Sequence, residues 1–127
     1  MGDGYILVVD DEADQRELMA ETLSIMGYEV ATAEDGQVAL DKMAERIPDL
    51  VLLDLRMPRL SGWGVLEAMK KMQRARNVPV LIISGFGFEW EAQLVGAAGY
   101  ISKPIDIDFL RQKVSRLAGP PREVLLH

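Results

Sequence analysis

Leu50-Val51-Leu52-Leu53-Asp54 is the stretch that decides the fold, because four consecutive apolar residues end abruptly in an acid. A continuous apolar run of this kind suits a strand that is buried on both faces, as in a parallel sheet covered by helices. Similar runs occupy Tyr5–Val9, Val78–Ile83 and, more weakly, Tyr100–Ile101. Glu29–Ala33 instead alternates polar and apolar residues, which is typical of an edge strand. The chain is therefore predicted to form five strands.

Segments with a helical period separate these runs. The apolar faces expected on the first, second, third and last helices are, in order, Leu18, Thr22, Ile25 and Met26; Ala39, Met43 and Ile47; Val65, Leu66, Met69 and Met72; and Ile107, Leu110, Val114 and Leu117. Glu89–Ala98 is helical by composition, but it is short and is interrupted by Gly96. Alternating strands and helices predict a doubly wound α/β domain, with right-handed crossovers and helices on both faces of a parallel sheet.

Composition limits the classes of function. The 127 residues are enough for one domain, and they contain no cysteine and a single histidine, His127. Disulfides, thiolate metal sites, cysteine nucleophiles, histidine zinc sites and serine–histidine triads are therefore excluded. A net charge of −6 argues against binding of nucleic acid or of an anionic membrane by this domain. Without a leader or an apolar run of spanning length, the chain is expected to be soluble and cytoplasmic.

Polar side chains stand where four of the five predicted strands end. Asp10 and Asp11 follow the first strand, Asp54 the third, Ser84 the fourth and Lys103 the fifth. In an open parallel sheet, ligands collect outside the carboxyl ends of the strands. Three carboxylates, a hydroxyl and an ammonium are thus predicted to meet at one edge of the sheet.

Clustered carboxylates need a counter-charge. At a separation of a few ångströms they repel by about 4 kcal/mol per pair at an effective dielectric constant near 20. Because only oxygen ligands are available, Mg²⁺ is the expected cofactor. A carboxylate at Mg²⁺ beside a lysine is also arranged to take up a phosphoryl group: Asp54 would attack in line, Lys103 would neutralise charge, and Ser84 would donate a hydrogen bond to the attached group.

Each of these residues, taken alone, also has a purely structural interpretation. Asp10, Asp11 or Asp14 could simply cap the first helix. Ser84 and Lys103 could be an ordinary loop hydroxyl and a solvated surface charge. An acid directly after Leu50–Leu53 is harder to explain in this way, because it costs stability unless it is paired or functional.

Four stretches together resemble the response-regulator receiver domain of two-component signalling. They are GYILVVDDE (4–12), LVLLDLRMP (50–58), VPVLIISG (78–85) and GYISKP (99–104), and the resemblance runs from about Tyr5 to Ala118. It implies a flavodoxin-like sheet of strand order 2-1-3-4-5 and a receiver domain over residues 1–118. Residues 119–127 are then expected to be a linker or a residual tail, beginning with Gly119-Pro120-Pro121.

The resemblance also implies a role for each residue of the site. The domain would be a phosphoacceptor rather than a turnover enzyme, with a sensor histidine kinase as phosphodonor and an output domain or downstream protein as its target. The implied residues are Asp54 as phosphoacceptor; Asp10, Asp11, Asp54 and the backbone carbonyl of Arg56 as Mg²⁺ ligands; Ser84 as switch hydroxyl; Tyr100 as the aromatic side chain that follows the switch; and Lys103 before a cis peptide bond to Pro104. For Tyr100, a half-buried strand aromatic without a switching role is the alternative.

The sequence departs from the family pattern between Ser84 and Lys103, where the interval is about one helical turn short. We assign the missing turn to the fourth helix, which is therefore predicted to be shortened. Gly85 and Gly87 flank Phe86 and would give this loop freedom to move toward a phosphoryl group. Two interpretations of its aromatic residues stay open: either they form an apolar docking surface, or they pack down in place of the lost turn. These residues are Phe86, Phe88 and Trp90. The mode of partner binding, including a homodimer, is left open too.

Arg56 would place a long cation beside Asp54, where it could pair with Glu12 or with the phosphoryl group and alter the rate of dephosphorylation. A Mg²⁺-dependent aspartyl phosphatase, one rival class, would normally carry its second acid at this position. With Arg56 there, the residue for general acid catalysis is lacking. A flavodoxin-like cofactor binder would need glycines and hydroxyls after the first strand, where this chain has acids. The closest rival is a pseudo-receiver that takes up no phosphoryl group and acts by protein contacts alone.

Overall fold

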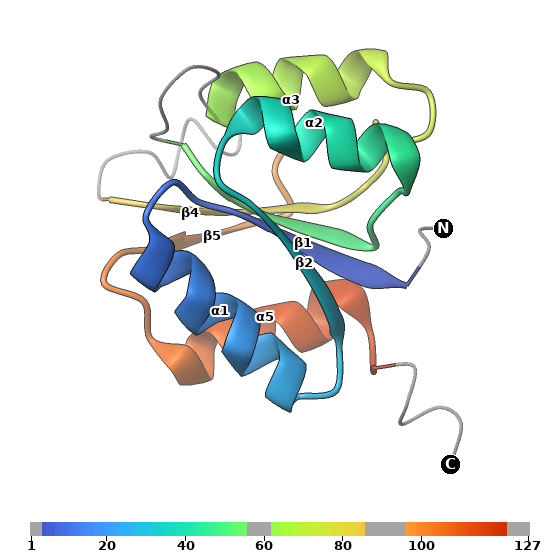
Figure 1. Cartoon of the computed structure of the whole chain (residues 1–127). Coiled ribbons are helices and arrows are strands. Elements are labelled where there is room, and N and C mark those ends of the chain that lie inside the picture. Colours follow the sequence, from blue (N-terminus) through green and yellow to red (C-terminus); the bar gives the residue numbers. More distant parts are fainter. Residues whose placement is uncertain (1–3, 56–61, 86–95, 122–127) are drawn as a thin grey trace.

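Five parallel strands form one sheet between two layers of helices (Figure 1). The computed structural model describes residues 4–55, 62–85 and 96–121. The strands are β1 (Tyr5–Val9), β2 (Glu29–Ala33), β3 (Leu50–Asp54), β4 (Val80–Ser84) and β5 (Gly99–Ser102). The described helices are α1 (Ala13–Ile25), α2 (Gly36–Glu45), α3 (Gly62–Lys71) and α5 (Ile107–Ala118). The strand order is β2-β1-β3-β4-β5, so the predicted fold is confirmed.

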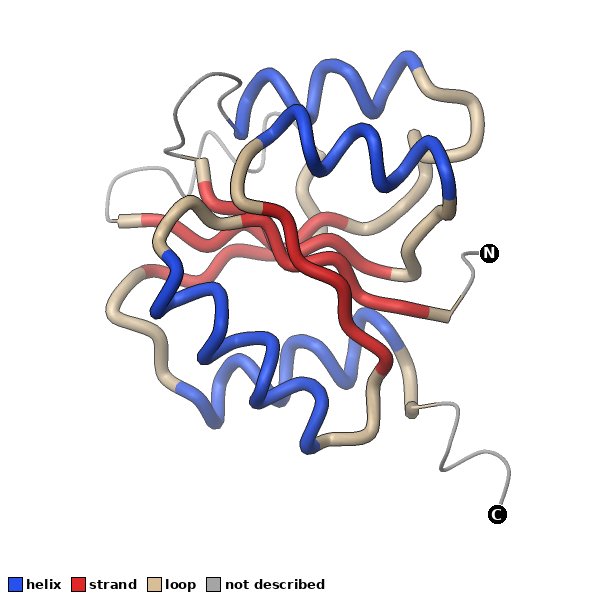
Figure 2. Tube along the Cα trace, in the orientation of Figure 1, coloured by secondary structure: helices blue, strands red, loops and turns tan. Residues whose placement is uncertain are grey.

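Each central strand sends alternate side chains to opposite faces of the sheet. Leu7 and Val9 of β1 belong to the apolar cluster under α2 and α3, whereas Ile6 and Val8 belong to the cluster under α1 and α5. Figure 1 and Figure 2 show α2 and α3 on one face of the sheet and α1 and α5 on the other. Because both faces are covered, the central strands have to be apolar at every position, which explains the continuous runs in the sequence.

The predicted strands are found with small changes at their ends. β2 lies at the edge of the sheet and pairs only with β1 among the described strands, as its alternating pattern indicated. β4 begins at Val80 rather than at Val78. Pro79 has no backbone N–H to donate to a neighbouring strand, although its carbonyl accepts from Val51 N at 3.1 Å.

The apolar face predicted for α1 is wrong in part. Leu18 is 48% exposed and Ile25 is 74% exposed, and the residues that α1 buries are Met19, Thr22 and Leu23. Moving the face by one residue turns the helix by about 100°, and Met19 and Leu23 then both point at the sheet. Thr22 tolerates burial because its hydroxyl donates to the Leu18 carbonyl at 2.8 Å.

The faces predicted for the other described helices agree with the structure. The buried residues that anchor them are Ala39, Met43 and Ile47 for α2 and its end, Val65, Leu66 and Met69 for α3, and Leu110 and Val114 for α5. Most of the predicted fourth helix, Glu89–Ala98, lies outside the described residues, as do Arg56, Phe86, Phe88 and Trp90. Across the described ranges, no helix combines the length and the apolar character needed to cross a membrane.

The corrected face of α1 can be tested by a pair of alanine substitutions. Leu23→Ala removes a fully buried side chain and should lower the free energy of unfolding by about 2–5 kcal/mol. Ile25→Ala, two residues away on the exposed side, should change it by less than about 1 kcal/mol. Chemical denaturation monitored by circular dichroism measures both values. Equal losses for the two variants would contradict this orientation of α1.

Candidate functional site

The carboxyl ends of the four strands β1, β3, β4 and β5 lie at one edge of the sheet, and each carries a polar residue of the site. Asp54 and Ser84 are the last residues of β3 and β4, and Asp10 and Lys103 directly follow β1 and β5. The register holds them together: Ser84 pairs with Ser102, and Lys103 N donates to Ser84 O at 2.8 Å. Sheet pairing therefore fixes the backbone from which these side chains extend.

Three aspartates lie close enough to share one cation. One carboxylate oxygen each from Asp10, Asp11 and Asp54 falls within 4.8 Å of the others. Asp10 is fully buried, Asp54 is 3% exposed and Asp11 is exposed. The group opens into a pocket of about 380 Å³, whose lining residues are Asp11, Glu12, Asp54, Ser84, Gly85 and Lys103.

Lys103 is the counter-charge of this cluster. Its Nζ lies 3.2 Å from Asp54 Oδ2, 3.7 Å from Asp10 Oδ2 and 3.5 Å from Glu12 Oε1. Only 21% of its side chain is exposed, so it is no ordinary solvated surface charge. Burial alone would lower the pKa of Lys103, but the carboxylates of Asp10 and Asp54 outweigh burial and raise that pKa.

Asp10 is the acid of the cluster whose pKa is raised above its ordinary value. Burial raises the pKa of Asp10 to about 6, and the charge of Asp54 acts in the same direction. The Glu12 N–H, which donates to Asp10 Oδ1 at 2.9 Å, and Lys103 both act to lower it. The net rise shows the expected cost of gathering carboxylates away from water.

Two buried polar atoms at this edge lack a hydrogen-bond partner among the described residues: Asp10 Oδ2 and Ser84 Oγ. Buried polar atoms without a partner are rare in folded proteins and call for a specific explanation. A carboxylate oxygen of this kind, next to two further carboxylates, fits a hard divalent cation. Asp10, Asp11 and Asp54 are the side chains that would hold Mg²⁺. The backbone carbonyl of Arg56, the remaining predicted ligand, lies outside the described residues.

Tyr100 and the segment after β5 complete the site. The Tyr100 ring is half-buried, and its hydroxyl donates to the Gly85 carbonyl at 2.5 Å. This bond links the strand that carries Lys103 to the loop that follows Ser84. The peptide bond between Lys103 and Pro104 is cis, as the resemblance implied.

The sequence of residues 6–115 matches the family model of the response regulator receiver domain. This chain belongs to that family.

Relatives of the receiver domain agree with this assignment. The chain is 36% identical to sporulation initiation phosphotransferase F of Bacillus subtilis over 114 residues, which cover 87% of this chain and 90% of that protein. It is 37% identical over 112 residues to a probable transcriptional regulator ycf27 of Porphyra purpurea, with 86% of this chain and 45% of that protein covered. The chain spans less than half the length of the first curated relatives that it matches.

Solved structures of receiver domains have the same fold. The receiver domain of NtrX from Brucella abortus matches with a TM-score of 0.82 and 40% identity, over 89% of this chain and 97% of that one. The chemotaxis protein CheY4 of Vibrio cholerae matches with a TM-score of 0.84 and 30% identity. The match covers 90% of this chain and 98% of that one.

The alternative that Asp10, Asp11 or Asp14 simply caps the first helix does not hold in this receiver domain. The residue at the N-cap of α1 is Glu12, and its side chain makes no capping hydrogen bond. Asp10 instead accepts from the Glu12 N–H, inside the loop before the helix. Ser84, likewise, is no loop residue, because it ends β4 and is fully buried.

Two residues near the site, Arg16 and Gly62, were missed by the sequence reasoning, and a third, Glu12, was named only as a possible partner of Arg56. Glu12 contacts Lys103, as given above, and Arg16 Nη1 donates to the Asp10 carbonyl at 2.9 Å. The spacing of Arg16, one helical turn after Glu12, would have suggested a pair with that acid rather than the observed bond to the Asp10 carbonyl. Gly62, the first residue of α3, packs against the backbone at the carboxyl end of β3: a Cβ there would lie 2.5 Å from Asp54 O and 2.6 Å from Leu55 Cα. Only the fold reveals this contact.

Gly62→Ala should damage the receiver domain although alanine is the better helix former. The new methyl group would overlap backbone atoms, so we expect the free energy of unfolding to fall by about 1–3 kcal/mol. Gly85→Ala is the matched control, because a Cβ at Gly85 meets nothing within 4 Å. Thermal and urea denaturation of both variants measure the difference. A Gly62→Ala variant as stable as the control would contradict the close approach of α3 to Asp54.

Proposed function

We propose that this receiver domain takes up a phosphoryl group on Asp54 from the phosphohistidine of a sensor kinase. One observation carries the proposal: the nearly buried Asp54 carboxylate lies 3.2 Å from Lys103 and within 4.8 Å of the oxygens of Asp10 and Asp11, at the wall of an open pocket. A carboxylate nucleophile with positive charge beside it is the arrangement that phosphoryl transfer needs.

The proposed transfer uses a carboxylate oxygen of Asp54 as nucleophile. This oxygen forms a bond to phosphorus while the phosphorus–nitrogen bond of phosphohistidine breaks, and the imidazole leaves with the electron pair and takes up a proton. Mg²⁺ held by Asp10, Asp11 and Asp54 would neutralise charge on the phosphoryl oxygens. The Lys103 ammonium, already in contact with Asp54, donates to one of those oxygens.

Ser84 and Tyr100 are the proposed switch residues. The Ser84 hydroxyl is buried without a partner among the described residues, so an acceptor oxygen on Asp54 would give it one. Movement of the loop after Ser84 would alter the contact between Gly85 O and the Tyr100 hydroxyl. The phosphorylated domain would then favour an active conformer that exists beforehand as a minority.

The same proposal covers the turnover of the domain and its target. The domain would act as a phosphoacceptor without multiple turnover, and its target would be an output domain or a separate protein. A pseudo-receiver is disfavoured because the acids, Ser84 and Lys103 converge on one pocket. A homodimer, a cytoplasmic location and the boundary of the domain at residue 118 stay predictions.

Asp54→Asn should abolish phosphorylation, since the amide is a far poorer nucleophile than a carboxylate. The wild-type domain, incubated with a small phosphodonor and Mg²⁺, should gain the mass of one phosphoryl group in intact-protein mass spectrometry. Asp49→Asn, at the opposite end of β3, is the matched control and should still be phosphorylated. Uptake by the Asp54→Asn variant, or none by the wild type, would refute the proposal.

Mg²⁺ binding should weaken in acid because of Asp10. Its pKa is raised to about 6, so its carboxyl is protonated below that pH and must lose a proton before it can bind a cation. We expect an apparent Kd that is constant above about pH 7 and rises by about tenfold for each pH unit below about 6. Titrations followed by tryptophan fluorescence measure it.

The Asp10→Asn variant provides the control for this pH dependence. It should bind Mg²⁺ more weakly at neutral pH and lose the acid-dependent rise near pH 6, because the titrating carboxyl is gone. An apparent Kd of the wild type that is the same at about pH 5 and about pH 7.5 would contradict the role of Asp10 as a ligand.

A further inference from the structure

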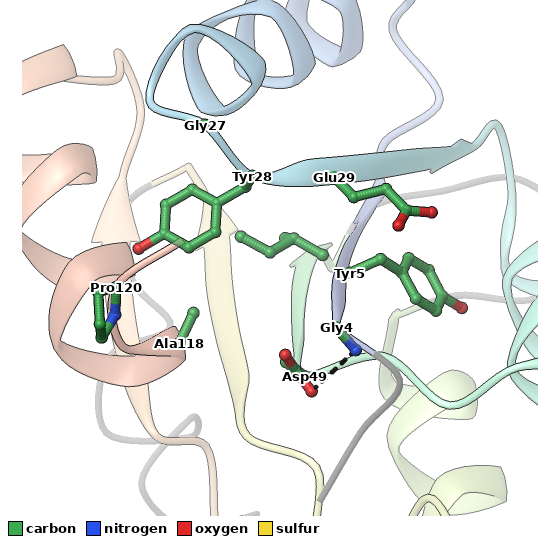
Figure 3. A pocket seen from close by; sticks show the side chains of 9 residues that line it. Gly4, Tyr5, Gly27, Tyr28, Glu29, Asp49, Ala118 and Pro120 are labelled. Atoms are coloured by element: carbon green, nitrogen blue, oxygen red, sulfur yellow. Dashed lines mark hydrogen bonds between the residues drawn. The ribbon is translucent and has the colours of Figure 1, made fainter. Parts of the chain in front are cut away.

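The turn between α1 and β2 contacts the segment that follows α5, at the end of the sheet opposite the acidic cluster. The Tyr28 hydroxyl donates to the Gly119 carbonyl, 91 positions away in the chain. Pro121 packs on Gly27, where a Cβ would lie 3.2 Å from Pro121 Cβ. In Figure 3 the Tyr28 ring points toward Pro120 and Ala118, whereas Tyr5 points the other way.

Gly27 suits this contact for two reasons. Its φ of +101° lies in a region that favours glycine, and it leaves room for the proline ring. The Tyr28 N–H donates to the Leu23 carbonyl at 3.1 Å, so the turn is held to the last part of α1. The surface that receives Pro121 is therefore fixed by the helix rather than by a loose loop.

The Tyr28 side chain is withdrawn from water where it meets the exit segment. It packs against the same apolar cluster as Leu117 and Ala118 of α5. Burial raises the pKa of the Tyr28 phenol, while a hydrogen bond with Ser115 acts to lower it. A pocket of about 130 Å³ lies beside the ring, with Gly27, Ala118 and Pro120 in its wall.

The exit segment is stiff by composition. Pro120 and Pro121 restrict φ and have no N–H to donate. Gly119, the C-cap of α5, donates to the Ser115 carbonyl at 3.1 Å and accepts from Tyr28. Residues beyond a last helix are normally loose unless they are tied down. Here both polar groups of the Gly119 backbone are bound, and the next two residues are prolines.

We propose that the α1–β2 turn is a docking site for the chain's own exit segment, Gly119–Pro121, and that Tyr28 is the positioning residue that sets the direction in which the chain leaves the receiver domain. The inference does not depend on the phosphoryl chemistry proposed above. The turn that receives the exit segment follows α1, the helix whose N-cap, Glu12, contacts Lys103.

Tyr28→Phe tests the proposal by removing one hydroxyl. Trypsin cleavage after Arg122 requires an extended segment that includes Gly119–Pro121, so it reports on release of the docked residues. We expect cleavage to become about fivefold faster, the effect of losing one typical hydrogen bond. The ¹⁵N heteronuclear NOE of the Gly119 amide should fall as well. Cleavage at sites within the folded domain should keep its rate, because the loss is local.

Tyr5→Phe is the matched control. Its hydroxyl also donates to a backbone carbonyl, that of Arg46 at 2.6 Å, and its ring points away from Pro120 in Figure 3. Cleavage after Arg122 should be unchanged in this variant. Equal rates for wild type and Tyr28→Phe would overturn the proposal, and so would equal acceleration at Arg122 and within the domain, which would show a general loss of stability.

Pro121→Gly provides a second, independent variant, because it changes a residue beyond the last helix and leaves the core intact. Loss of the proline contact with Gly27 should lower the Gly119 heteronuclear NOE relative to wild type. An unchanged NOE in this variant would overturn the proposal even if the Tyr28→Phe protein failed to fold.

Discussion

The attraction between one lysine and a nearly buried group of carboxylates is the interaction on which the rest of the site depends. Asp10 and Asp54 have almost no contact with water, and their mutual repulsion is opposed by Lys103 and by the Glu12 N–H that donates to Asp10. Lys103 itself is held by the sheet, through its N–H bond to Ser84 O. The strand register therefore sets the electrostatics: a shift of β5 along β4 would move the ammonium away and leave two carboxylates unopposed.

The same sheet explains why all the chemistry lies at its edge. β1, β3 and β4 are covered on both faces, and their side chains fill two apolar clusters. A charge within these strands would have no partner and no water, whereas a residue at the carboxyl end meets a pocket and the ends of neighbouring strands. Asp54 belongs to β3 by its backbone pairing, and its side chain lines the pocket, so a nearly buried carboxylate on a fixed backbone faces the space where a ligand could bind.

The sequence predicted the strand ends and the sheet topology correctly, because there a residue type at a particular position was enough to decide the structure. An acid after Leu50–Leu53 marked a strand end, and the order of four motifs gave the sheet topology through the family. It failed for the α1 face because several apolar residues there allow two helix orientations, and only packing on the sheet selects Met19 and Leu23 over Leu18 and Ile25. Gly62 and Tyr28 were missed for a similar reason. Each contacts a segment that is distant in the sequence, and no local sequence pattern predicts that the two segments pack together.

The two ends of the sheet differ in their side chains, and α1 runs from one end to the other. The carboxyl end is acidic and opens into a pocket, and the hydrogen bond from the Tyr100 hydroxyl to the Gly85 carbonyl links β5 to the loop beside that pocket. At the other end, Tyr28 and Gly27 contact Gly119 and Pro121 after α5. α1 joins the two over 13 residues, about 20 Å at 1.5 Å per residue. Glu12 before its first residue contacts Lys103, and the turn after its last residue contacts the exit segment, so α1 spans the distance between the two ends while Met19 and Leu23 anchor it in the core between them.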